Sequence, residues 1–261
     1  GHLVPRHPGN WVAHLFPAFA AGAGHDVLDV RRKPVVAILA TGDELVEPGT
    51  VPGAGQIVSS NPYGLAPMIA AAGGEARLLG IARDTREALA AKIAEARDAD
   101  VLVTIGGASV GDHDLVAPAL EAAGTKIGFW KIAMRPGKPM MFGTRGAQRV
   151  LGLPGNPVSS MICARVFLVP LIRRLLGLSD QGPLRETARL AHPLEANGPR
   201  THFMRATLTR NSAGAFIAAA LPNQDSSLIS ALAAADGLIV RDVAAPALAA
   251  GDPVEVLRLD F

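Results

Sequence analysis

A glycine-rich segment, residues 106–114 with the sequence GGASVGDHD, carries the residue types best suited to holding an anion. It directly follows the apolar run 101–105, so it is predicted to be the loop at the end of a buried strand. Glycines allow backbone N–H groups to approach a ligand closely, Ser109 adds a hydroxyl donor, and two aspartates add carboxylates. The pattern indicates a cradle for a phosphate with its cation, although similar loops also occur as plain turns.

A basic loop, residues 134–139 with the sequence MRPGKP, is the second candidate. It brings Arg135 and Lys138 together, with Lys131 just upstream, and three cations on a short segment favour a multiply charged anion. A solvated basic turn is the alternative. The segment is not a P-loop, because the first glycine and the Ser or Thr after the lysine are missing.

A third loop, residues 152–157 with the sequence GLPGNP, leads into a predicted helix. Asn156 is expected to cap this helix, with Pro157 as its first residue. The helix N-terminus would then point free N–H groups, together with the hydroxyls of Ser159 and Ser160, at a tetrahedral oxyanion. Simple helix capping explains the same residues equally well.

Carboxylates also follow the predicted strands, and two or three of them facing cationic loops could hold Mg²⁺ against a pyrophosphate. Asp84 and Asp114 could instead cap helices, and Asp43 could close a turn, so Glu44 is the hardest to explain structurally. His113 has no second His or Cys nearby, which argues against a zinc site. The carboxylates considered are Asp43, Glu44, Asp84, Asp112 and Asp114.

The elements that must position these loops alternate between strands and helices. This alternation predicts a three-layer α/β/α domain with a mostly parallel sheet, whose functional loops meet at the carboxyl ends of the strands. The expected strands are 35–40, 77–81, 101–105, 127–130, 140–142 and 150–153, and the expected helices are 11–23, 63–72, 84–97, 115–123 and 158–176.

Beyond Gly177 the pattern changes to short strand-like segments separated by prolines. Such segments predict a small C-terminal β domain, either a sandwich or a partly open barrel. The segments are 187–191, 203–208, 216–220, 238–240 and 254–259. We therefore expect an α/β domain over residues 31–178, a β domain over residues 184–261, and in residues 1–30 a linker or the remnant of a preceding region.

The composition narrows the possible partners and location. Net charge is +2 and aromatic residues make up only 4% of the chain, which argues against nucleic acid as a partner. Cys163 is the only cysteine and has apolar neighbours, so it is predicted to be a core residue in a protein of a reducing, cytoplasmic compartment. The apolar stretches are too short for a membrane span, so no membrane partner is expected.

Taken in order, the segments TGDEL, IARDT, GGASVGDHD, KIAMRPGKP and GLPGNPVSS strongly resemble the molybdopterin molybdenumtransferases, the molybdenum insertase family that includes the E domain of gephyrin. The β domain continues the resemblance through Arg200, Phe203, Arg205 and residues 224–227. The resemblance implies that molybdate and adenylylated molybdopterin bind together as substrates. The adenylate anhydride would be cleaved with Mg²⁺, AMP would be released, and molybdenum would enter the dithiolene.

Matching motif positions also imply residue roles. Glu44, Asp84 and Asp114 would be the acidic catalytic residues, with Asp84 and Asp114 at the metal. Lys131, Arg135 and Lys138 would neutralise phosphates or molybdate. Pro154, Pro157 and Ser159 would shape the molybdate pocket, and the other substrate-binding positions would be Thr41, Gly42, Asp43, Gly106, Gly107, Ser109, Gly111, Gly137, Gly155 and Asn156.

The chain departs from the family pattern at its start, because family members usually carry a long region before the position of Arg31 that is almost entirely absent here. The full-length family is expected to form homodimers, and activity of this shorter chain is a separate question. Two alternatives remain open at this point. One is a non-catalytic molybdopterin-binding or scaffold module. The other is a molybdopterin adenylyltransferase, which shares the central fold but lacks the MRPGKP and GLPGNP pair and the β domain.

Overall fold

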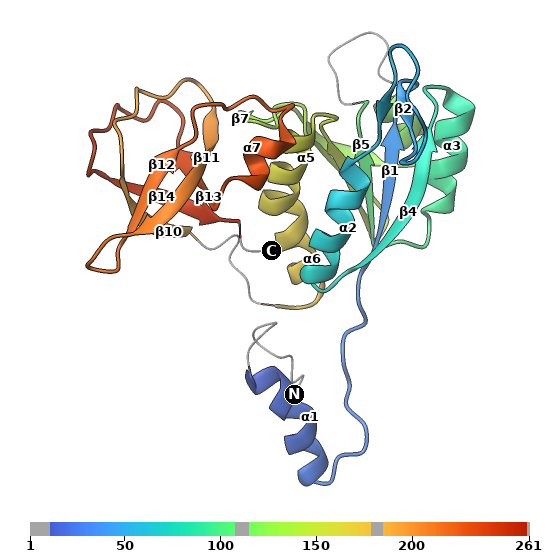
Figure 1. Ribbon diagram of the computed structural model, residues 1–261. Helices are drawn as coiled ribbons and strands as arrows, with labels where there is room; N and C mark the ends of the chain where they lie inside the picture. Colours follow the sequence, from blue (N-terminus) through green and yellow to red (C-terminus); the bar gives the residue numbers. More distant parts are fainter. Residues whose placement is uncertain (1–10, 108–114, 179–184, 260–261) are drawn as a thin grey trace.

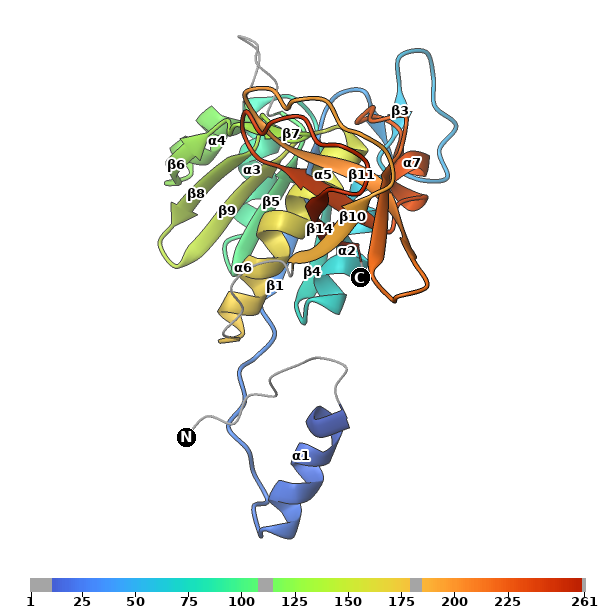
Figure 2. The same ribbon diagram turned by 90° about the vertical axis from the view of Figure 1, so that its left-hand side faces the viewer.

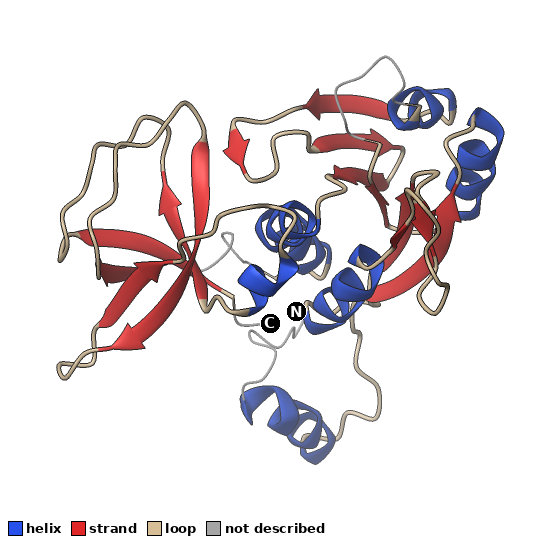
Figure 3. Ribbon diagram, turned by 45° about the horizontal axis from the view of Figure 1, so that its top comes forward, coloured by secondary structure: helices blue, strands red, loops and turns tan. Residues whose placement is uncertain are grey.

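The structure, a computed structural model, describes residues 11–107, 115–178 and 185–259. Two six-stranded sheets dominate it, and Figure 1 shows them side by side with helices between them. The same arrangement is seen from above in Figure 3, where blue helices separate the two groups of red strands. Together they confirm the predicted combination of an α/β sheet structure and a small C-terminal β domain.

The first sheet has the strand order β4-β1-β5-β9-β8-β6. Four neighbouring strands are parallel, β8 runs antiparallel to β9, and β6 runs antiparallel to β8. Strand β6 therefore points the same way as the four parallel strands, so five strands end at the same edge. Their bounds are β1 Val35–Thr41, β4 Glu75–Ala82, β5 Val101–Ile105, β6 Lys126–Trp130, β8 Met141–Arg145 and β9 Gln148–Leu153.

Both faces of this sheet are covered, which is why its central strands are almost continuously apolar. In β1, Val36 and Ile38 belong to one core cluster, while Ala37 and Leu39 belong to the other. The first cluster lies under α2 (Asn61–Ala71), α5 (Pro157–Cys163) and α6 (Val169–Leu175), and the second under α3 (Arg86–Glu95) and α4 (Val116–Ala122).

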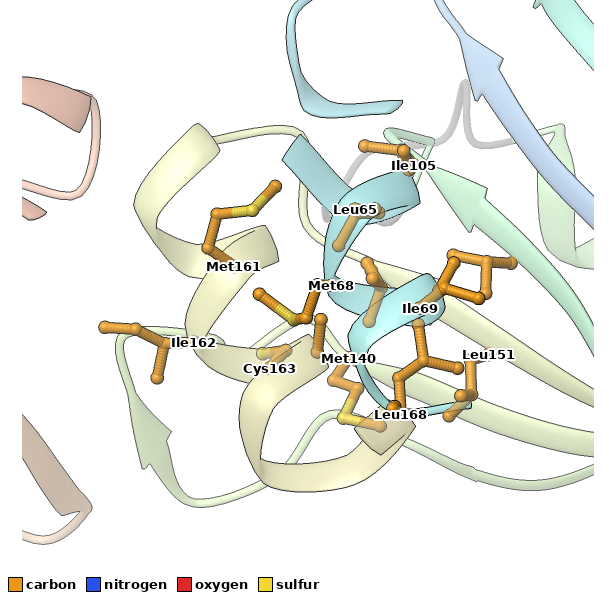
Figure 4. Close-up of a cluster of buried hydrophobic side chains, with 14 of the residues drawn as sticks. Leu65, Met68, Ile69, Ile105, Met140, Leu151, Met161, Ile162, Cys163 and Leu168 are labelled. Carbon is orange, nitrogen blue, oxygen red and sulfur yellow. The ribbon is translucent and has the colours of Figure 1, made fainter. Parts of the chain in front are cut away.

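Figure 4 shows part of the first cluster, where Met68 and Ile69 of α2 lie among side chains of α5 and of the sheet. Cys163 is in the same cluster and is fully buried. Burial raises the pKa of its thiol to about 12, so the sulfur is protonated and unreactive at neutral pH. The predicted core position of this cysteine is confirmed.

The long helix predicted over 158–176 forms three consecutive helical segments. A π-helical turn, Ala164–Leu168, joins α5 to α6 without a break in the chain direction. Such turns insert one residue into the helical repeat. Gly177, at φ +77°, ends the run as expected for a left-handed helix terminus.

The second sheet has the strand order β12-β10-β14-β13-β11-β7, and β11 also pairs with β12. That extra pairing closes the five C-terminal strands on themselves, so the predicted small β domain is barrel-like. Its strands are β10 Arg185–Leu190, β11 Thr201–Arg210, β12 Phe216–Ala220, β13 Gly237–Arg241 and β14 Pro253–Arg258, and the short helix α7 is Ile229–Ala233.

Three short strands were not predicted from the sequence. Strand β7, Met134–Arg135, lies in the basic loop and pairs in parallel with the start of β11, so this part of the α/β region joins the second sheet. Strands β2 (Leu45–Val46) and β3 (Ile57–Val58) form a small parallel ribbon between β1 and α2 in the chain.

The helix predicted at 11–23 forms as α1, Trp11–Gly22. Figures 1 and 2 show it apart from both sheets, at the end of an extended connection. No helix among the described residues has both the length and the apolar character needed to cross a membrane.

Candidate functional site

A cavity of about 900 Å³ lies where the loops after the strands of the first sheet meet the β domain. The convergence of these loops on one edge was predicted from the parallel strand pattern. Most of the predicted binding residues line the cavity: Thr41, Glu44, Gly106, Gly107, Arg135, Gly137, Lys138, Pro154, Gly155, Asn156, Pro157 and Ser159. Gly42, Asp43, Asp84 and Lys131 are not among the lining residues.

The loop after β1 places a carboxylate at the cavity edge. Gly42 has φ +149°, and a Cβ there would lie 2.6 Å from Oε2 of Glu44. The glycine therefore gives the Glu44 side chain room to fold back across the backbone. Thr41, which is buried, and Glu44 both face the cavity.

The loop after β4 lies directly beside it. Thr41 pairs with Ala82 across the two parallel strands, and the backbone N–H of Asp84 donates to Oδ1 of Asp43 at 3.1 Å. Partial burial, followed by the charges of Asp43 and Glu44, raises the pKa of Asp84. Three carboxylates thus concentrate negative charge at this corner of the site, a setting that favours a bound cation.

Asp84 does not cap the helix that follows it. Thr85 occupies the N-cap of α3, and its hydroxyl accepts a hydrogen bond from the N–H of Ala88 at 3.2 Å. The structural explanation considered for the Asp84 carboxylate was therefore wrong, and this carboxylate is free of that role.

The glycine loop after β5 needs its first two residues to be glycine. Gly106 has φ +94°, and a Cβ there would lie 2.6 Å from the carbonyl oxygen of Thr41. Gly107 has φ +61°, and a Cβ there would collide with Val116. The backbone of this loop can therefore come close to a ligand in the cavity. The other predicted residues of the loop, Ser109, Gly111, Asp112, His113 and Asp114, lie outside the described residues.

The three cations of the basic segment do not all reach the cavity. Arg135 and Lys138 line the cavity, whereas the Lys131 ammonium lies 5.3 Å from the ring centroid of Trp130. Lys131 is thus engaged in a cation–π contact and is not part of the cavity lining.

Strand pairing brings a second set of basic residues to Arg135, because His202 of β11 is its register partner in β7. Burial, followed by the charges of Arg135, Arg200 and Arg205, lowers the pKa of His202 to about 4. The imidazole is therefore neutral at pH 7, and the arginines provide the positive charge. Arg200 itself lines the cavity.

The start of α5 has fewer free donors than the sequence suggested. Asn156 is at the N-cap position as predicted, but its side chain makes no cap bond and instead donates to Oγ of Ser226 at 3.1 Å. Pro157 has no N–H, and the N–H of Val158 donates to the carbonyl oxygen of Ser226 at 3.1 Å. Ser159, which is buried and lines the cavity, lies in this first turn.

In the sequence, Asn61 followed by Pro62 predicts a helix start with Asn61 as the N-cap. Ser60 occupies the N-cap position of α2 instead, so this prediction was wrong. The buried amide of Asn61 reaches the GLPGNP turn instead and donates to the carbonyl oxygen of Gly155 at 2.7 Å. This bond ties α2 to the turn before α5.

Sequence reasoning gave no site role to three groups of lining residues. They are the ribbon of β2 and β3 with the polar run that follows it, Arg200, and the β-domain loop 224–227. The polar run Ser59-Ser60-Asn61 was a usable signal, since it follows a strand and precedes a helix. The loop 224–227 reaches the cavity only through the packing of the β domain against α5, which local sequence patterns do not report.

Among the described residues, no group of three or more His, Cys, Asp or Glu side chains lies close enough to hold a metal ion. Mg²⁺ usually needs only one or two carboxylates, with phosphates and waters completing its shell. The crowded carboxylates near Asp84 fit that limited demand. The cavity therefore has Arg135, Lys138 and Arg200 in its lining, together with Glu44, while Asp43 and Asp84 lie beside it; this combination suits a polyanion bound together with a cation.

Comparison with known proteins agrees with this geometry. Residues 37–174 match the family described as "probable molybdopterin binding domain", and residues 187–259 match the MoeA C-terminal region (domain IV). The two matches fall on the two parts of the chain that form the cavity.

Individual curated relatives are named molybdopterin molybdenumtransferases. A molybdopterin molybdenumtransferase of Nostoc sp. is 40% identical over 69% of this chain and 42% of its own length. Another from Haemophilus influenzae is 34% identical over 86% of this chain and 56% of its own. The chain thus spans about half the length of these curated relatives.

Among solved structures, the molybdopterin biosynthesis MoeA protein of Pyrococcus horikosii superimposes with a TM-score of 0.78 at 32% identity, covering 94% of this chain and 59% of that one. The fold, the order of the motifs and the family match agree with one another. The chain belongs to the family of the probable molybdopterin binding domain, here followed by a MoeA-type C-terminal region.

Proposed function

We propose that this chain carries the substrate site of a molybdopterin molybdenumtransferase. It would bind adenylylated molybdopterin and molybdate together, and insert molybdenum into the dithiolene with cleavage of the adenylate anhydride and release of AMP. The observation that supports this most directly is the cavity itself, in which Arg135, Lys138 and Arg200 converge with the start of α5. Both substrates are polyanions, and a partly enclosed cationic wall of this kind would bind them.

The basic residues would act by charge neutralisation. Arg135 and Arg200 can each present two parallel N–H donors to a phosphate or molybdate, and Lys138 adds a compact charge. Ser159 would contribute its hydroxyl at the base of the same wall. The glycine backbone at 106–107 would lie along the ligand, where side chains would be in the way.

The acidic residues of the loops after the strands would act on the reacting phosphates. Glu44 lines the cavity, and we propose that it holds or transfers a proton at the reacting phosphate. Asp84, with Asp114, would hold Mg²⁺, which would neutralise charge on the phosphates when bound. The raised pKa of Asp84 fits this role, because a carboxylate crowded by Asp43 and Glu44 gains from a nearby cation.

A cytoplasmic location and a homodimer belong to the same proposal. The single cysteine, buried and protonated, suits a reducing compartment. Dimer formation is inferred from the family resemblance, and sedimentation velocity of the purified chain measures it.

The proposed function is tested by mixing the purified chain with adenylylated molybdopterin, molybdate and Mg²⁺ and following AMP. We expect AMP release that depends on molybdate, with no consumption of ATP. Consumption of ATP would indicate an adenylyltransferase instead. Binding of molybdopterin without AMP release under any condition would favour a non-catalytic binding module.

A matched pair of variants links the reaction to the cavity. Glu44→Gln removes a carboxylate that lines it, and Glu47→Gln removes an exposed one in the same region that accepts a hydrogen bond from Tyr63 at 3.1 Å. We expect AMP release to be lost in the first and retained in the second. Equal activity in the two variants would contradict the role of Glu44.

A further inference from the structure

A buried arginine lies behind the β-domain wall of the cavity. Arg205 of β11 is only 1% exposed, and it is not one of the lining residues. Its guanidinium donates to the carbonyl oxygen of Asn223 at 3.0 Å and to that of Asp225 at 2.9 Å. A planar guanidinium presents its donors in a fixed geometry, so it holds these two carbonyl groups at a set separation.

Gln224 reinforces the same attachment. Its Oε1 accepts from the backbone N–H of Arg205 at 3.0 Å, and its Nε2 donates to the carbonyl oxygen of Arg205 at 3.0 Å. The loop is therefore joined to β11 at three successive residues. Within the loop, Oδ1 of Asp225 accepts from both the N–H and the hydroxyl of Ser227 at 2.9 Å, which makes the turn compact.

The far side of this loop contacts α5. The carbonyl oxygen of Ser226 accepts from the N–H of Val158, and its Oγ accepts from the amide of Asn156. A continuous chain of hydrogen bonds thus runs from Arg205, through the loop, to the first turn of α5. Residues 224–227 line the cavity along this chain.

A charged side chain is a costly means of holding a loop if stability is the only requirement. The carbonyl groups that accept from the guanidinium are neutral, and burial lowers the pKa of Arg205 more than the nearby charge of Asp225 raises it, so the hydration lost on burial is only partly compensated. In return, the guanidinium fixes the positions of the Asn223 and Asp225 carbonyl groups relative to each other. These fixed positions matter at the cavity wall, where a displacement of about 1 Å can reduce the efficiency of a site about 100-fold.

We propose that Arg205 is a positioning residue of the cavity. It holds the loop 223–227 against α5 and thereby fixes the position of this part of the cavity wall. The choice of molybdate as the ligand rests on the proposed function, whereas the positioning of the loop by Arg205 does not. Arg205 acts through the loop and not by contact with a substrate.

Arg241 offers a matched control in the same β domain. It is 3% exposed and its guanidinium also donates to backbone carbonyl oxygens, those of Glu195, Ala245 and Pro246. None of these three residues lines the cavity. Arg205→Met and Arg241→Met therefore remove comparable buried groups, one bonded to a loop that lines the cavity and one bonded to residues outside the lining.

The test is titration of the folded variants with molybdate by calorimetry. We expect Arg205→Met to weaken molybdate binding about 10- to 100-fold and Arg241→Met to change it less than about twofold, even if both lower the melting temperature. Arg205→Lys keeps the positive charge but cannot hold both carbonyls, so it should also weaken binding. Wild-type affinity in a folded Arg205→Lys or Arg205→Met protein would overturn the proposal.

Hydrogen exchange of the backbone amides in 223–227 provides a second readout that needs no ligand. These amides should exchange faster in Arg205→Lys, and in Arg205→Met where it folds, but not in Arg241→Met. Unchanged exchange would overturn the proposal. Failure of the wild-type chain to bind molybdate would count against the proposed function instead, and the exchange comparison would still decide the role of Arg205.

Discussion

The side-chain amide of Asn61 donates a hydrogen bond to the carbonyl oxygen of Gly155 at 2.7 Å, and so connects the start of α2 to the turn before α5. Both residues line the cavity. Asn61→Ala would leave this carbonyl without its donor, which should lower the free energy of unfolding by about 1–3 kcal/mol. It should also weaken molybdate binding, because the GLPGNP turn loses a support.

A second buried amide provides the control for this prediction. Nε2 of Gln148 donates to the carbonyl oxygens of Ala96 and Ala99 at 2.6 and 2.8 Å, at the start of β9 and so at the opposite edge of the sheet. Gln148→Ala should destabilise the protein to a similar extent but leave molybdate binding unchanged. Chemical denaturation and calorimetry measure the two effects, and equal loss of binding in both variants would refute the specific role of Asn61.

Asp84 should be dispensable for stability and required for activity. Because its surroundings raise its pKa, the neutral side chain of Asp84→Asn relieves an unfavourable charge, and the melting temperature should stay the same or rise. AMP release and molybdenum insertion should be lost. Asp98→Asn is the opposite case, since the hydrogen bond from Arg77 at 2.7 Å lowers the pKa of Asp98 to about 2. That variant should lose stability and keep activity, and a reversed pattern would contradict the assignment.

The basic loop should show unequal contributions from its cations. Arg135→Ala removes a guanidinium from the cavity wall and should weaken molybdate binding by about 1.5–3 kcal/mol, or about 10- to 100-fold. Lys131→Ala removes a charge that lies against Trp130, outside the lining, and should have a much smaller effect. Calorimetric titration of both variants decides this, and equal losses would mean that the loop acts only through its total charge.

His202 should make the folded protein sensitive to mild acid. Its pKa is about 4 in the folded chain and near 6.5 when unfolded, so between these values the unfolded state binds more protons. The associated stability is fully present above pH 6.5 and is lost as the pH falls towards 4. Urea unfolding at pH 7 and pH 5 should therefore show a smaller pH effect in His202→Gln than in the wild-type chain. The same pH effect in both proteins would show that His202 is not responsible.

The loops that form this site could be predicted from the sequence, because parallel strands place the loops that follow them at the same edge of the sheet. Apolar runs such as 35–40 and 101–105 indicated buried strands, and parallel strands must place the loops that follow them on one edge. Thr41 and Gly106 accordingly meet in the structure, where the glycine backbone leaves no room for a side chain. The positions of the loops follow from local patterns and one rule of topology.

The partners of individual side chains at the site could not be predicted, because they depend on contacts between distant segments. Asn61 reads as a helix cap from its neighbours, but Gly155, 94 residues further along, takes its amide. The role of Arg205 is likewise set by the carbonyl groups of a loop that lies 18 to 20 residues further along the chain. A sequence reports which groups are present, whereas their hydrogen-bond partners are selected by packing.

Met134 and Arg135 belong to the first part of the chain, but they pair with Thr201 and His202 of the β domain. The two parts follow one another in the sequence, whereas in the structure they share a sheet. A fragment ending near residue 178 would keep β7 without the strand it pairs with. A fragment starting near residue 185 would leave Thr201 and His202 at the start of β11 without the strand that they pair with, and an unpaired edge is prone to recruit strands from other molecules. Expressed separately, the barrel should therefore be more prone to aggregation than the intact chain, even with its own core complete.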